Sequence, residues 1–284
     1  MTAASTTAAA TAAARSLRAH FVGTYSALRI ALVVVAGLLP LTLLVHSLID
    51  GSPLRGSMSA YYYSGARDLF VGGLFVVSGL LIAYQGYSQR ENHVLDAAGA
   101  ALILVAVFPT EDPAARAAQV EAPGALGFLS VHGAAAVVFF LCIAYVCWFR
   151  ARDTLPLVSG NATFGRKQYR ALYKGVGIAL ALSPLAAIVV AFLTRASDTQ
   201  PSFIFWIEAF GVWTFGVYWA LKTMELRRSD AEALAAAGRL TDPPGEGGPV
   251  TVIEPDLEEA LDPDGLTPEQ AAQVQAYVLG TGEG

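Results

Sequence analysis

The chain has 284 residues, of which 55% are hydrophobic and only 14% are charged, with a formal net charge of −5. Soluble domains carry about 25% charged residues, so a mean hydropathy of +0.51 over this length excludes an ordinary soluble domain and indicates a multi-pass membrane protein. The partner that this composition predicts is the lipid bilayer, and a nucleic-acid partner is not expected.

The first 22 residues form a leader of low sequence complexity that is rich in alanine and threonine. A secretory signal would carry early basic residues and a cleavage site after its apolar core, and neither is evident here. We therefore expect a disordered cytoplasmic leader over residues 1–22, followed by a transmembrane domain over residues 23–224.

Six apolar runs follow the leader, and each is close to the roughly 20 residues that span a bilayer at 1.5 Å per residue. Only helices or closed barrels satisfy the backbone in lipid, and these continuous runs lack the two-residue alternation of barrel strands. The sequence therefore predicts an all-α fold, a six-helix transmembrane bundle. The predicted spans are 27–49, 67–87, 93–110, 126–149, 171–193 and 203–223.

The distribution of basic residues predicts the orientation of these spans, because cytoplasmic loops carry an excess of Lys and Arg. With a cytoplasmic N-terminus, 14 basic residues fall on the inner segments and 4 on the outer ones. The even number of spans then places the C-terminus in the cytoplasm as well.

The C-terminal segment, residues 225–284, differs in composition from the rest of the chain. It holds 13 acidic and 3 basic residues, so we expect a mostly disordered acidic cytoplasmic tail. Thr267 and Gln270 form a capping box that predicts one short helix near 268–279. The tail either solubilises the protein or docks a cytoplasmic partner.

Ionisable residues in the predicted spans gather toward the outer end of the bundle. His132 lies about two turns into the fourth span, Glu208 between one and two turns into the sixth, and Asp68 begins the second. Such groups cost several kcal/mol in a bilayer unless they are paired or hydrated, so they are functional candidates. We expect an outward-facing polar pocket with Asp68, His132 and Glu208 as its catalytic candidates. The alternative is a structural polar layer that fixes helix packing.

The segments that border this pocket supply further candidates for ligand binding. The 50–68 loop offers hydroxyl groups and a guanidinium, and the sequence FPTED after the third span offers two carboxylates. The binding candidates are Ser57, Ser59, Tyr61, Arg67, Glu111 and Asp112.

A stripe of glycines on the second span indicates which way Asp68 points. Gly72, Gly79 and Gly86 repeat every seven residues and fall on nearly the same helix face as Asp68. Small residues let a neighbouring helix approach closely. We therefore expect this stripe to be a packing seam, with Asp68 pointing into the bundle.

A hydrolase at the outer face is the first function that these residues suggest. Catalytic zinc takes His nitrogen and carboxylate oxygen ligands and keeps one position open for water. A serine triad from Ser57 or Ser59 with His132 and Asp68 is a variant, although the G-x-S-x-G elbow is absent from the sequence. The candidate metal ligands are His46, Asp68, His132 and Glu208.

Two further functions use the same residues without hydrolysis. A transporter, channel or receptor would bind a ligand in the pocket, although the inner half of the predicted bundle carries only Asp96 and offers no continuous polar path. A non-catalytic membrane scaffold would use the polar layer as helix glue and the acidic tail as its docking segment. The sequence leaves the choice between these functions and an enzyme open.

Four segments together resemble an uncharacterised family of bacterial multi-pass membrane proteins. The family shares an S-x-S-A-Y-Y … R-D-x-F-V-G segment, a following A-x-F-P-T, a His on the fourth span and an E-x-x-x-x-W-x-F on the last. The corresponding segments here are SMSAYYYSGARDLFVGG, AVFPT, SVHGAAAVVFF and EAFGVWTF, between residues 57 and 222. This resemblance implies a bacterial plasma (inner) membrane location.

A more distant likeness is to ceramidase- and adiponectin-receptor-like membrane hydrolases, which also place Ser, Asp and His on separate spans. Those proteins have seven spans and a paired His motif on the last. This chain has six predicted spans, with Glu208 and Trp213 on the last, so the likeness is an analogy of layout.

Overall fold

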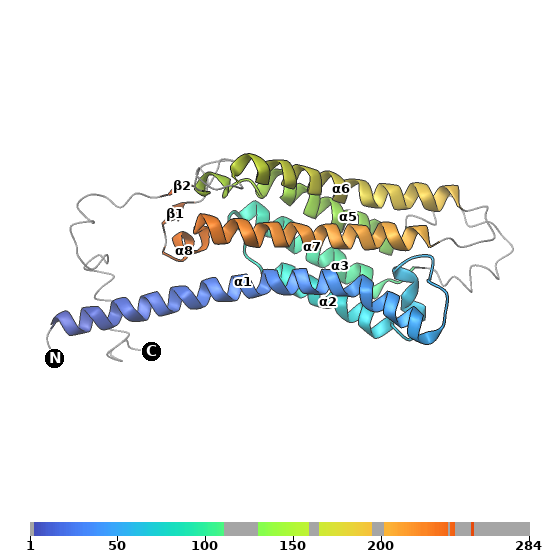
Figure 1. The fold of residues 1–284 in the computed structure, drawn as a ribbon, viewed down its shortest axis with the longest axis horizontal. Helices are drawn as coiled ribbons and strands as arrows, with labels where there is room; N and C mark the ends of the chain where they lie inside the picture. Colours follow the sequence, from blue (N-terminus) through green and yellow to red (C-terminus); the bar gives the residue numbers. More distant parts are fainter. Residues whose placement is uncertain are drawn as a thin grey trace.

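The structure is a computed structural model, and it describes residues 3–110, 130–158, 165–194, 202–237, 239–241 and 251–252. Six long helices run alongside one another in a bundle (Figure 1), which confirms the all-α expectation. The strands of the described part are β1 (Leu240–Thr241) and β2 (Thr251–Val252), which pair antiparallel. The six helices are α1 (Ala3–Asp50), α2 (Arg67–Ala83), α3 (Gln89–Val107), α5 (Val131–Tyr145), α6 (Arg166–Leu193) and α7 (Phe203–Ser229).

Four of these helices are long and apolar enough to cross a membrane. They are α1 from Arg15 onward, α5 with its π-helical extension η3 (Val146–Arg150), α6 and α7. Helix α2 is shorter, with 17 residues, and α3 carries charged residues at its start. The chain therefore has the architecture of a helical membrane protein, with four spans supported by both length and composition.

Helix α1 begins far earlier than the first predicted span. Residues 3–22, expected to form a disordered leader, are its first turns, and in Figure 1 this end of α1 extends beyond the other helices. This corrects the leader expectation. The physical reason is composition: alanine has the highest helix propensity, and no glycine or proline precedes Gly23.

Helix α7 continues past the predicted end of the last span at residue 223. Glu225 is fully buried in the bundle, and α8 (Ala231–Ala236) follows after Asp230, whose φ of 51° allows the chain to turn. Arg29 Nη1 of α1 donates to Glu232 Oε1 of α8 at 2.5 Å. Residues 225–236 therefore belong to the bundle and not to an acidic tail. The predicted helix near 268–279 and most of that tail lie outside the described residues.

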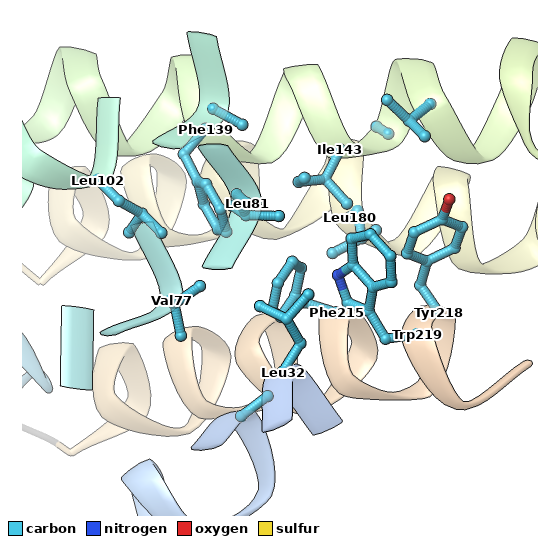
Figure 2. Close-up of a cluster of buried hydrophobic side chains, with 14 of the residues drawn as sticks. Leu32, Val77, Leu81, Leu102, Phe139, Ile143, Leu180, Phe215, Tyr218 and Trp219 are labelled. Carbon is cyan, nitrogen blue, oxygen red and sulfur yellow. The ribbon is translucent and has the colours of Figure 1, made fainter. Parts of the chain in front are cut away.

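Six helices contribute apolar side chains to one continuous core. Figure 2 shows Phe139 of α5, Leu81 of α2 and Leu32 of α1 directed toward Phe215 and Trp219 of α7. Interdigitated packing of this kind is what holds helices together in lipid, where the hydrophobic effect between them is weak. This apolar layer separates the two ends of the bundle, each of which carries its own buried polar groups.

The glycine stripe on α2 does not form the expected seam. A side chain at Gly72 or Gly79 would meet open space, and both positions are exposed. The close contact between α2 and α3 lies elsewhere, at Gly99, whose Cβ would come within 3.0 Å of the Ser78 carbonyl oxygen. The Ser78 hydroxyl also donates to the Gly99 carbonyl at 2.8 Å. Gly72 and Gly79 therefore face away from the bundle, whereas Gly86 lies after the end of α2, where its Cβ would come within 2.5 Å of Glu91 Oε2.

Candidate functional site

A polar chamber lies at the end of the bundle where the segment 52–60 covers the ends of α5, α6 and α7. Its cavity volume is about 670 Å³, and its walls combine polar side chains with apolar ones such as Ala136, Phe140 and Ala187. We call this cavity the chamber. Its charged or hydrogen-bonding side chains include Arg55, Ser57, Ser59, Ser130, His132 and Glu208.

Backbone contacts with α7 hold the segment 52–60 over the chamber. The Met58 amide donates to Glu208 Oε2 at 2.6 Å, and the Phe205 amide donates to the Gly56 carbonyl at 2.9 Å. The Ser57 hydroxyl accepts from the Ala60 amide at 3.1 Å and so ties the segment to the start of the short 3₁₀ helix η1 (Ser59–Tyr63). The half-buried Glu208 thus both lines the chamber and anchors its cover.

His132 is held in one orientation by the end of α3. Its Nδ1 lies 3.0 Å from the Val105 carbonyl oxygen and 2.9 Å from that of Phe108. A carbonyl can only accept, so Nδ1 carries a proton and donates. In the neutral ring, Nε2 is then the acceptor, and it is the nitrogen left for the chamber that His132 lines. Orientation of one imidazole nitrogen by a backbone carbonyl is common where the other nitrogen acts on a ligand.

The structure separates Asp68 and Arg67 from the chamber. Asp68 is exposed on the first turn of α2, so the expectation that it points into the bundle is wrong. Arg67 is also exposed, with its guanidinium 4.3 Å from the Tyr62 ring centre and a 2.8 Å hydrogen bond to the Tyr62 hydroxyl. The reason is rotation of α2, which turns its glycine-bearing face outward. Neither residue lines the chamber, and a triad through Asp68 has no geometric support.

Tyr61 is a core residue and does not line the chamber. Its side chain is fully buried, its hydroxyl lies 2.5 Å from Ser47 Oγ, and its ring packs on Phe205 at 5.9 Å between centroids. Tyr63 donates to the Thr110 carbonyl at 2.7 Å. These two tyrosines therefore tie the loop to α1, α7 and the end of α3.

The four candidate metal ligands do not converge. His46 packs against Tyr61 and Gly65 instead of lining the chamber, and Asp68 is exposed. In the part of the chain that the structure describes, no three His, Cys, Asp or Glu side chains come together as a metal site. The binding candidates Glu111 and Asp112 lie outside the described residues. Of the residues predicted for the pocket, the chamber unites Ser57, Ser59, His132 and Glu208.

A second buried polar group, which the sequence analysis missed, occupies the α8 end of the bundle. Lys222 Nζ donates to Thr154 Oγ1 at 2.7 Å and to Glu225 Oε2 at 3.0 Å, and Tyr173 donates to Glu225 Oε2 at 2.6 Å. All four side chains are buried. We call Lys222, Glu225, Thr154 and Tyr173 the Lys222 cluster. It corrects the expectation that this half of the bundle carries only Asp96.

A sequence signal for the Lys222 cluster existed in the spacing of its charges. Lys222 and Glu225 stand three residues apart, so they share a helix face if the helix continues past residue 223. Because the last span was predicted to end at residue 223, Glu225 was assigned to the tail, and its pairing with Lys222 was missed. Glu91 in the first turn of α3, which accepts from the Tyr87 amide at 2.9 Å, is also buried at this end of the bundle.

Asp153 and Arg150 form an ion pair in the turn that follows η3, with 3.4 Å between Nη1 and Oδ2. Asp153 is 4% exposed. Burial raises the pKa of its carboxyl, and the nearby Arg150 charge lowers that pKa by less, so the pKa is about 6. Loss of hydration is thus the larger effect on this group, as is common when an ion pair is taken out of water.

Comparisons of the chain with protein-family models, with curated proteins and with solved structures find no match. The chamber itself indicates a ligand chemistry. His132 Nε2 in the neutral ring accepts a hydrogen bond, and the Glu208 carboxyl retains acceptor positions beyond those that the Met58 and Ser59 amides use. A ligand group that donates hydrogen bonds, such as an amine or a hydroxyl, is complementary to this pair.

Proposed function

We propose that the protein is an integral membrane protein with six spans that binds a small molecule or a lipid headgroup in the chamber, on the outer side of the membrane. In this proposal α2 and α3 complete the set of spans begun by the four apolar helices. A bacterial plasma membrane and cytoplasmic termini complete the proposal. They are supported by the excess of basic residues on the inner segments and by the family resemblance.

One observation carries this function: the oriented imidazole of His132 and the carboxyl of Glu208 line one cavity at the same end of the bundle. They come from α5 and α7, and the covering segment adds the Ser57 hydroxyl. A polar layer that only fixed helix packing would need no open space beside it. Here His132 bonds to α3, Glu208 bonds to the 52–60 segment, and both still border about 670 Å³ of space.

The experiment that tests this function uses two adjacent alanines of α6. Ala187 lines the chamber, whereas Ala186, about 100° further round the helix, is exposed on an apolar face. In intact cells, A187C should react with a membrane-impermeant maleimide, since thiol labelling requires contact with water. A186C should not react, because its thiol faces lipid.

Binding is then measured as protection of A187C. A panel of amines, polyols and lipid headgroups is screened. A true ligand should slow the labelling of A187C but not that of A187C/E208Q or A187C/H132A. A thiol that reacts only after the cells are permeabilised would contradict the outward orientation. Labelling that no compound slows would favour the scaffold alternative, in which the polar layer is structural.

The Lys222 cluster favours transport as the second candidate function. Buried polar groups at both ends of the bundle are what an alternating pathway needs, and the core around Phe139 and Phe215 would then be the barrier between them. Substituting Phe215 with Ala should raise uptake of a chamber ligand into proteoliposomes if this barrier gates transport. Unchanged uptake alongside preserved binding would leave the receptor function.

A further inference from the structure

A second cavity, on the opposite face of the α6–α7 pair, adjoins the chamber. It has a volume of about 840 Å³ and runs along α6 from Gly175 to Thr194 beside the start of α7. We call it the groove. Its walls are almost entirely apolar, and several of its side chains are exposed, among them Leu182, Phe203 and Phe210. In a membrane-spanning helix pair, such a face meets the hydrocarbon of the bilayer.

Ser183 connects the two cavities, because it lines both of them. Its hydroxyl donates to the Ile207 carbonyl at 3.3 Å, and a Cβ at Gly211 would lie 2.5 Å from its oxygen, so α6 and α7 are in close contact at this level. Toward the 52–60 end, small residues follow on α6. Ala186 lines the groove and Ala187 lines the chamber, so the helix offers little bulk between the two cavities there.

Proline adds local weakness at the same level of α6. Pro184 lies inside the helix and cannot donate a backbone hydrogen bond to the Leu180 carbonyl, so this turn is held less firmly than its neighbours. Ser183 and the proline beside it thus mark the level of α6 at which the two cavities meet. Both cavities lie against that part of the helix pair.

We propose that the chamber and the groove form one site for an amphiphile whose alkyl chain lies in the groove. Its polar head, which donates hydrogen bonds, passes over Ser183 to reach Glu208 and His132. This inference rests on the proposed function of the chamber and names its ligand class. The head is an amine or hydroxyl group, because the chamber presents the Glu208 carboxyl and His132 Nε2 as acceptors.

Energetics favour entry from the membrane over entry from water. Moving an alkyl chain out of hydrocarbon costs about 0.8 kcal/mol per CH₂, so a chain of about twelve carbons would lose roughly 10 kcal/mol in water. A groove that opens to lipid spares the chain this loss. Residues 175–194 of α6 extend about 28 Å at 1.5 Å per residue, whereas the hydrocarbon of one leaflet is roughly 15 Å thick. The groove is therefore long enough for an alkyl chain that lies within one leaflet.

The test uses two photoreactive C12 probes in nanodiscs: a primary amine, and the same chain with a trimethylammonium head that cannot donate. Mass spectrometry then locates the cross-links. The amine should label α6 and α7 residues of the groove. E208Q should weaken this labelling by about tenfold or more, since one hydrogen bond to a charged group contributes about 1.5–3 kcal/mol and about 1.4 kcal/mol is tenfold. The trimethylammonium probe should label the groove about as weakly as the amine labels E208Q.

Blocking the groove supplies the matched variants. A186W fills the groove and should abolish labelling, whereas V138W places the same bulk on an exposed position of α5 and should leave it unchanged. A186L is the smaller block if A186W does not accumulate. If the labelling yield is the same for both probes and unchanged in E208Q, the groove makes only ordinary contact with bilayer lipid, and the proposal is overturned.

A head-only probe separates this inference from the proposed function. If ethylamine protects A187C while the C12 amine fails to label the groove, the chamber binds ligands and the amphiphile proposal falls. If neither probe protects A187C nor labels the groove, the proposed function falls with it. Protection by ethylamine together with head-dependent labelling of the groove supports both.

Discussion

Replacing Lys222 by methionine should destabilise the protein by about 3–5 kcal/mol, the usual cost of leaving one member of a buried ion pair without its partner. Lys222 is 1% exposed and Glu225 is fully buried. In the K222M variant, Glu225 keeps the hydrogen bonds from Thr154 and Tyr173, at 2.5 and 2.6 Å. It loses the ammonium that lies 3.0 Å away, so a carboxylate remains in the core without a cation.

The double variant K222M/E225Q separates the lost charge from the lost packing. A neutral glutamine still accepts from Tyr173, so the double variant should recover at least about 1 kcal/mol relative to K222M alone. The free energy of unfolding is measured on purified protein in detergent micelles, by circular dichroism during reversible denaturation. Lys174 is exposed on α6, and K174M should stay within about 0.5 kcal/mol of the parent.

Two outcomes would refute this reasoning about the Lys222 cluster. If K222M were as stable as K174M, the ion pair would contribute nothing that methionine packing cannot replace. If the double variant were destabilised by the sum of the two single changes, Lys222 and Glu225 would act independently despite their 3.0 Å contact.

Three further predictions follow from the described contacts. Because burial raises the pKa of Asp153 from 3.8 to about 6, the folded protein binds this proton more tightly than the unfolded chain. The carboxyl therefore costs up to about 3 kcal/mol above pH 6, and the cost vanishes as pH falls to about 4; D153N should flatten this part of a stability–pH profile. G99A should cost about 1–3 kcal/mol because its Cβ would lie 2.6 Å from an Ile82 side-chain carbon, whereas G79A, which meets open space, should gain about 0.5–1 kcal/mol in thermal unfolding. Y61F should lower the midpoint of thermal unfolding at a cost of about 1–3 kcal/mol because it leaves the buried Ser47 hydroxyl without its 2.5 Å partner, and an unchanged midpoint would refute this role.

Part of the candidate site was predictable because it depends on position along a helix. The distance of His132 and Glu208 from the start of each span sets their depth in the bundle, and the structure indeed places both around one cavity. Ser57 and Ser59 line it for a similar reason, since a loop between two spans must lie at a bundle end. The chamber thus lies at one end of the helices, and the outward orientation of that end stays a prediction.

The parts of the site that sequence reasoning missed depend on where helices end and what lies beside them. Glu225 and Glu91 needed the true bounds of α7 and α3 before they could be assigned to the bundle. Tyr61 resembled a ligand-binding residue in a polar loop, yet its ring fills a gap beside Phe205. Contacts between segments far apart in sequence decide these cases.

The sequence by itself determined that the chain is a helical membrane protein and which residues lie near the ends of its helices. Hydropathy and helix length are properties of one segment, so they require no knowledge of its neighbours. Only the tertiary structure decided which way each helix faces. The glycine stripe on α2 was compatible with packing or with exposure, and neighbouring helices turned it and Asp68 outward. Rotation about a helix axis is set by packing against partners, and one segment read alone carries no record of them.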